Sequence, residues 1–114
     1  MSDLIRHASI MLLMNTPKKG SIRCIIFKDG NTWYGVALEF NIVVSADDAD
    51  VVRFNLDEAI RGYVESMRKL KGTRVSPLNQ TPMKEYSDLW KKLVAKKPIP
   101  SPYKVRHFGV TTVW

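Results

Sequence analysis

The chain contains only one cysteine, Cys24, and two histidines, His7 and His107, among its 114 residues. A single cysteine excludes a disulfide framework within the chain and is typical of a reducing compartment. Cys24 lies in the middle of a predicted strand, where a small core residue is expected. Because the spacing brings neither histidine next to it, the sequence predicts no nucleophilic site.

Long apolar runs and clustered glycines are also lacking. No stretch approaches the roughly 20 apolar residues that a membrane-spanning helix needs. The six glycines are scattered along the chain, so no phosphate-binding loop is expected. The short apolar run within residues 1–16 follows Asp3 and lacks a small-x-small cleavage site, which favours a cytoplasmic protein over a secreted one.

Convergent carboxylates are scarce as well. Two-metal nuclease chemistry needs several of them around ions roughly 4 Å apart, and the predicted strands supply only Glu39. Asp47, Asp48 and Asp50 lack the glycine turn and the distant glutamate of an EF-hand loop. The sequence therefore predicts a protein that is not an enzyme and that holds no metal or cofactor.

Positive charge is abundant, and it is confined to one half of the chain. Residues 1–55 hold six Lys/Arg and six Asp/Glu, whereas residues 56–114 hold twelve and five, which accounts for the net charge of +7. Such an imbalance indicates either an acidic partner or a solvated surface. Basic residues that alternate with aromatic residues can bind nucleic acid. The candidates in this chain are Lys91, Lys92, Lys96, Lys97, Lys104 and Arg106. The competing interpretation, which the sequence favours, places Trp90 and Phe108 in the core and the lysines in solvent.

Residues 21–45 carry the pattern of three consecutive strands. Residues 21–28 alternate apolar side chains on both faces, and Asp29-Gly30 is a strong hairpin signal before a second strand over 32–40. We expect that strand to bury Tyr34, Val36, Leu38 and Phe40. Residues 42–45 add a third, β-branched strand, which completes an antiparallel meander.

A long amphipathic helix follows and is expected to cover one face of the meander. Its apolar stripe is Leu56, Ala59, Ile60, Tyr63, Val64, Met67 and Leu70. Asn55 and Glu58 resemble a capping box, and Gly72 occupies the position of a terminating glycine. For residues 46–54 two alternatives stay open. The aspartates there either extend the helix backwards or lie in a loop.

The two ends of the chain add further elements. Residues 3–14 fit a short helix or a buried strand, and periodicity does not separate the two. Thr81-Pro82 predicts the start of a second helix that ends near Lys97. Residues 103–114 then predict a closing strand, bent at Gly109. The sequence thus predicts one α+β domain over residues 1–114.

The central stretch resembles the HicB-like antitoxin domain family. The resemblance covers roughly residues 21–71 and is carried by an aromatic-rich strand, a β-branched strand and a helix start. The matching residues are Trp33, Tyr34, Val36, Ala37, Glu39, Phe40, Ile42, Val43, Val44 and Ser45, then Asn55, Glu58, Ala59 and Ile60. Residues 73–114 form a basic helix-strand extension that matches neither a ribbon-helix-helix nor a helix-turn-helix module.

The resemblance implies a β-β-β-α-β fold similar to a partial RNase H-like sheet. It also implies a protein-binding role, in which the domain occludes the active site of a small mRNA-cleaving toxin of the HicA type, and it implies self-association. Because such toxins are basic, Glu39, Asp47, Asp48 and Asp50 become the candidate partner-binding residues. Nucleic-acid binding through the basic C-terminal half, and a stand-alone homo-oligomer, are the alternatives.

Overall fold

A computed structural model gives the fold of the protein, and it describes residue 15, residues 20–69 and residues 78–112. The predictions for residues 3–14 and for a helix end at Gly72 lie outside the described residues. Within them, the chain is α+β, with a four-stranded antiparallel sheet and two α-helices. No helix in the described part of the chain is both long enough and apolar enough to cross a membrane.

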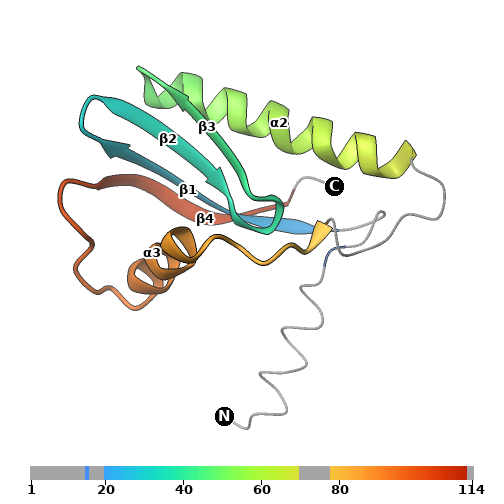
Figure 1. Ribbon diagram of the computed structural model, residues 1–114. Coiled ribbons are helices and arrows are strands. Elements are labelled where there is room, and N and C mark those ends of the chain that lie inside the picture. Colours follow the sequence, from blue (N-terminus) through green and yellow to red (C-terminus); the bar gives the residue numbers. More distant parts are fainter. Residues whose placement is uncertain (1–14, 16–19, 70–77, 113–114) are drawn as a thin grey trace, which may run out of the picture.

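The elements follow one another as β1, β2, the 3₁₀ turn η1, β3, α2, α3 and β4. Their bounds are Ser21–Asp29, Thr32–Ala37, Leu38–Phe40, Ile42–Ala46, Ala49–Lys69, Lys84–Val94 and Lys104–Thr112. In space the strand order is β3-β2-β1-β4, so the first strand and the last lie side by side (Figure 1). The three-stranded meander is confirmed, and β4 extends it beyond β1.

The hairpin between β1 and β2 is the one that Asp29-Gly30 predicts. Asp29 pairs with Thr32, which leaves a loop of Gly30 and Asn31. Gly30 has a φ of +64°, a left-handed conformation that glycine adopts without steric cost. A two-residue loop with glycine in its first position matches the twist of the two strands.

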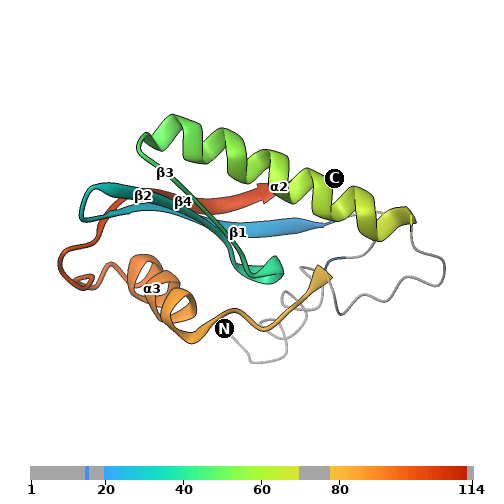
Figure 2. The same cartoon turned by 45° about the horizontal axis from the view of Figure 1, so that its top comes forward.

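Both faces of the sheet are covered, so the molecule has three layers (Figure 2). The cluster under α2 contains Ile22 and Cys24 of β1, together with Leu56 and Ile60 of the helix. The cluster under α3 contains Ile25, Phe27, Val36, Leu38 and Leu89. The alternation predicted for β1 is therefore confirmed, because each of its faces meets a different helix.

The prediction of a single buried face on residues 32–40 is wrong. Regular strand geometry ends at Ala37, and the next three residues form η1. A 3₁₀ turn has three residues per turn instead of the two-residue alternation of a strand. As a result Phe40 joins the α2 cluster while Val36 and Leu38 join the α3 cluster.

Helix α2 begins seven residues earlier than the capping-box signal indicates, because its cap is Asp48 and not Asn55. It starts at Ala49, so Asn55 lies inside the helix and is exposed. Asp48 caps it instead, because its Oδ1 accepts hydrogen bonds from the backbone N–H groups of Asp50 (2.7 Å) and Val51 (3.2 Å). Ala49 and Val52 continue the buried stripe backwards. Of the two alternatives for residues 46–54, the helical one is confirmed from Ala49 onward.

The C-terminal elements also differ from prediction in detail. Helix α3 starts at Lys84, after the predicted Thr81-Pro82, and ends at Val94 rather than near Lys97. In β4 the register against β1 shifts between Ile26 and Phe27, which leaves Arg106 as the extra residue. The irregularity thus lies at Arg106 and not at the predicted Gly109.

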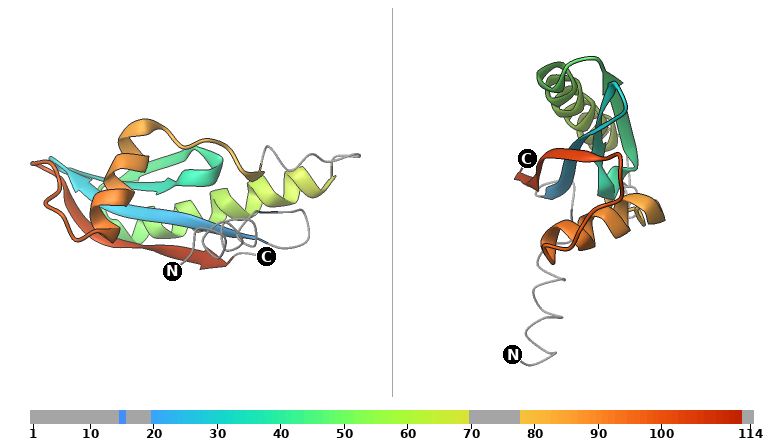
Figure 3. Two further views of the ribbon diagram at one scale, coloured as in Figure 1. Left: turned by 90° about the horizontal axis from the view of Figure 1, so that it is seen from below. Right: turned by 90° about the vertical axis from the view of Figure 1, so that its left-hand side faces the viewer.

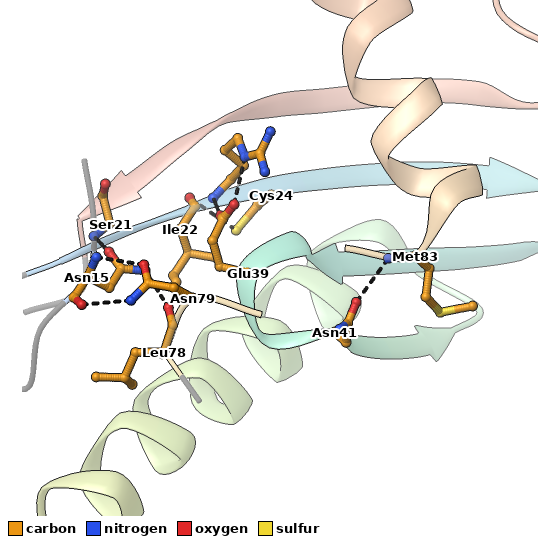
Figure 4. Close-up of polar contacts among 10 residues, drawn as sticks. Asn15, Ser21, Ile22, Cys24, Glu39, Asn41, Leu78, Asn79 and Met83 are labelled. Atoms are coloured by element: carbon orange, nitrogen blue, oxygen red, sulfur yellow. Dashed lines mark hydrogen bonds and ion pairs between the residues drawn. The ribbon is translucent and has the colours of Figure 1, made fainter. Parts of the chain in front are cut away.

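Three asparagines link segments that are distant in the sequence (Figure 4). Asn15 is fully buried, donates from Nδ2 to the carbonyl of Leu78 (2.8 Å) and accepts at Oδ1 from the N–H of Ser21 (2.7 Å). Asn79 accepts from the backbone N–H of Asn15 (2.7 Å) and donates to its carbonyl (2.8 Å). Asn41 has a φ of 52° and accepts from the N–H of Met83 (3.1 Å), which fixes where α3 begins.

Candidate functional site

Glu39, the first predicted partner-binding residue, is committed to a contact inside the fold. Its Oε1 accepts a hydrogen bond from the backbone N–H of Arg23, and its Oε2 accepts one from Arg23 Nε, both at 2.7 Å (Figure 4). Only 15% of the Glu39 side chain is exposed. Glu39 therefore links η1 to β1, and both of its carboxylate oxygens already accept a hydrogen bond from Arg23, which leaves little of the carboxylate for a basic partner.

The three predicted aspartates lie together, but far from Glu39. Asp47 and Asp48 precede α2, and Asp50 is in its first turn. The five residues of β3 separate them from η1, about 17 Å along an extended strand. Asp48 is the helix cap, and Asp50, 86% exposed, lies 3.9 Å from Arg106 Nη2. The predicted acidic surface therefore does not converge.

A different acidic site is present on the other face of the sheet. A hollow of about 370 Å³ lies between α3, the end of β1 and the segment that leads into β4. We call it the acidic hollow, and its lining residues include Asp29, Glu85, Asp88, Lys92 and Tyr103. Three carboxylates face one ammonium group there, in a chain whose net charge is +7. A hollow of this size with several convergent polar groups is a binding-site candidate.

The helix positions explain how α3 supplies its share of the hollow. Glu85, Asp88 and Lys92 are three and four residues apart, so they lie on one face of the helix. Leu89, next to Asp88, is buried in the cluster beneath and anchors that face against the sheet. The remaining wall comes from residues 100–103, which bend back towards β1.

A cluster of aromatic rings packs beside the hollow, and one of them, Tyr103, lines it. Phe27 lies at the centre, with ring centroids of Tyr103 at 4.9 Å, Tyr34 at 5.5 Å and Tyr86 at 6.2 Å. Tyr103 both packs on Phe27 and lines the hollow. Aromatic faces carry partial negative charge, so they attract cations as the carboxylates do.

The pKa values of two of these tyrosines are raised, chiefly by burial and secondly by nearby carboxylates. Burial, followed by the charge of Glu85 and its hydrogen bond, raises the pKa of Tyr86 to about 12. Burial also raises the pKa of Tyr103, and the charges of Glu85 and Asp29 add to the effect. Both phenols therefore stay neutral at pH 7, and the potential around them disfavours any further negative charge.

The carboxylates do not form a metal centre. Among the described residues, no three His, Cys, Asp or Glu side chains lie close enough together to hold an ion. Cys24 is 4% exposed, and burial raises the pKa of its thiol to about 11, so the thiolate is scarce at neutral pH. The arrangement is suited to binding a cationic side chain by charge and ring contact.

The predicted nucleic-acid residues are distributed over two elements. Lys91 and Lys92 are in the last turn of α3, Lys96 and Lys97 follow it, and Lys104 and Arg106 belong to β4. All are exposed except Lys92, which lines the acidic hollow. The nearby Trp90 is already in contact with Arg23, whose guanidinium lies 5.7 Å from its ring centre, and with the edge-on ring of Phe108 at 5.8 Å. These contacts leave little of its ring for stacking on a base.

Comparison with known proteins identifies no relative of the chain. No protein-family model, curated protein or solved structure matches the chain. The resemblance to HicB-like domains and the prediction that the chain is not an enzyme both stay predictions. The geometry of the acidic hollow is therefore the starting point for function.

Proposed function

We propose that the chain is a non-catalytic protein-binding module, of the kind that HicB-like antitoxin domains exemplify, and that it binds a small basic protein through the acidic hollow. The expected partner is an mRNA-cleaving toxin of the HicA type. The observation that carries the proposal is the set of three carboxylates, Asp29, Glu85 and Asp88, around a hollow that Tyr103 also lines. A basic side chain of the partner would enter there.

Inhibition by occlusion requires a complementary surface and no chemistry from the inhibitor. The hollow supplies local charge of the sign opposite to that of such a toxin. This proposal moves the partner surface from the acids before α2 to the opposite face of the sheet. The succession of β1, β2, β3 and a long helix supports it, since the HicB resemblance implies the same succession.

The test is first to look for an adjacent reading frame that encodes a small basic protein, as the proposal expects, and then to co-express that protein with the chain. We expect the full-length chain to form a stable complex and to relieve the growth arrest that the toxin causes. The double variant Glu85→Lys/Asp88→Lys should weaken the complex at least about tenfold, because a charge pair at a desolvated contact is worth roughly 2–5 kcal/mol.

The matched control is Glu58→Lys/Glu65→Lys on the exposed side of α2, which makes the same change in net charge. We expect that control to bind like the unmodified chain. Equal losses in both variants would reduce the effect to net charge and would contradict a role for the hollow. A chain that has no such neighbour, and that instead binds RNA with a steep salt dependence, would favour the nucleic-acid alternative.

A further inference from the structure

Strand β4 lies at the border of the sheet (Figure 3). All of its residues except Arg106 pair with β1 on the inner side, and no described strand pairs with its outer side. Among the described residues, no strand therefore uses the backbone N–H and C=O groups of that outer edge. Natural proteins usually protect such an edge with charged side chains, prolines or bulges.

On β4, the features that protect an edge against pairing with another strand are confined to the first half of the strand. Lys104 and Arg106 lie there, and so does the register shift at Arg106. From His107 to Thr112 the strand runs in unbroken register with β1 and carries no lysine, arginine or carboxylate. The second half of the edge is thus both regular and free of the charges that prevent strand pairing.

Apolar side chains flank this second half on the face that carries α3. Phe108 and Val110 lie opposite Ile25 and Arg23, and they are 39% and 58% exposed. Trp90 packs edge-on against Phe108, and Val94, one turn further along α3, is also exposed. The open strand edge therefore continues into an apolar strip, which water solvates poorly.

We propose that two copies of the chain pair β4 with β4, antiparallel, about a two-fold axis that lies midway between Gly109 of one copy and Gly109 of the other. This inference does not depend on the proposed function. Facing residues of an antiparallel pair point to the same side of the sheet, so the axis must lie between a residue and its own copy. With Gly109 facing Gly109, each Phe108 faces the other copy's Val110, and each His107 faces the other copy's Thr111.

The charge distribution selects a second copy as the occupant. Antiparallel pairing places the basic first half of one β4 beside or beyond the uncharged second half of the other. No lysine or arginine then faces another, whereas parallel pairing would oppose Lys104 to Lys104 and Arg106 to Arg106. An axis at Gly109 also joins both apolar strips into one cluster of two phenylalanines and two valines. It leaves the acidic hollows free, because they lie at the Lys104 end of each strand.

Sedimentation equilibrium of the full chain tests the proposal. The 13.0 kDa chain should sediment as a dimer of twice that mass at micromolar concentration. Val110→Lys, which puts a charge into the apolar strip, should raise the dissociation constant at least about tenfold. Val43→Lys is the matched control, since Val43 is 41% exposed on the same face of β3, the opposite edge strand. Circular dichroism establishes that both variants fold.

A cross-link locates the axis. Opposed Cα atoms in an antiparallel pair are about 4.5–5.5 Å apart, within the range a disulfide spans. Gly109→Cys should therefore form a covalent dimer on mild oxidation, whereas Thr112→Cys, about 20 Å from its own copy, should not. The unmodified chain is the negative control, and it should form no covalent dimer because Cys24 is buried. A monomer at all concentrations, dissociation by Val43→Lys alone, or equal cross-linking at both positions would overturn the proposal.

Discussion

Adding one methyl group at Gly35 tests how closely α2 packs on the sheet. A Cβ atom at this position of β2 would lie 2.7 Å from Cγ1 of Val52, 3.2 Å from Cγ2 of Val44 and 3.3 Å from Cδ2 of Leu56. The first contact is closer than carbon atoms tolerate, and a helical valine has essentially one χ1 rotamer and cannot turn aside. Gly35→Ala must therefore push α2 away from the sheet.

Overpacking of a core in this way costs about 1–3 kcal/mol of the free energy of unfolding. Val52→Ala alone should also destabilise, by about 1.6 kcal/mol for two methyl-sized groups at roughly 0.8 kcal/mol each, plus a cavity term. In the double variant the new methyl enters the space that Val52 vacates. We expect the double variant to be more stable than the sum of the single changes predicts, by about 1 kcal/mol or more.

Urea denaturation at one fixed protein concentration measures these differences from the midpoint, provided that the slope stays constant. Gly62→Ala is the control: Gly62 is exposed in α2, and nothing lies within 4 Å of a Cβ there. It should stabilise the protein by about 0.5–1 kcal/mol, because alanine favours a helix over glycine. A neutral Gly35→Ala, or strict additivity with Val52→Ala, would refute the close approach of α2 to β2.

Two further predictions concern Glu39 and Cys24. Glu39→Ala should lower the free energy of unfolding by about 1.5–3 kcal/mol, because two donors of Arg23 lose a charged acceptor. At a temperature at which the variant is still folded, it should leave the affinity for the proposed basic partner unchanged. An unchanged denaturation midpoint would contradict this prediction. Because burial raises the pKa of Cys24 from 9.0 to about 11, folding stability should be full below pH 9 and fall as pH rises to 11, by up to roughly 2.7 kcal/mol. Cys24→Ala should flatten that part of a stability-against-pH curve, and an identical curve would contradict the assignment.

The sequence predicts the parts of the fold that local signals determine. Asp29-Gly30 specifies its hairpin because the turn needs only neighbouring residues. The two-faced alternation of β1 is also readable, since each face is apolar by itself. The start of α2 cannot be predicted in this way, because Asn55 and Asp48 both precede sequences that can form a helix. The buried positions of Ala49 and Val52 decide between them, and burial depends on the sheet.

The candidate site is harder to predict from the sequence than the fold, because its residues are far apart in the chain and come together only in the folded structure. Asp29, Asp88 and Tyr103 come from β1, α3 and the segment before β4. The spacing of Glu85 and Asp88 on one helix face is a signal, but it does not tell which strand end lies opposite. The prediction that Glu39 binds a partner fails for the same reason. Its partner Arg23 is sixteen residues earlier, and the 3₁₀ turn after Ala37 brings the two together.

The strand order β3-β2-β1-β4 has a consequence for the protein during its synthesis. A ribosome that adds about 5–20 residues per second needs roughly 4–15 s to proceed from Asp29 to Lys104. Until β4 is synthesised, β1 has β2 on one side and no described strand on the other, and until α3 is synthesised that helix does not cover Ile25 and Phe27. Nascent chains that stop before residue 104 therefore present an apolar central strand as an open edge. They are the species that we expect chaperones to bind, and that we expect to aggregate when chaperones are scarce.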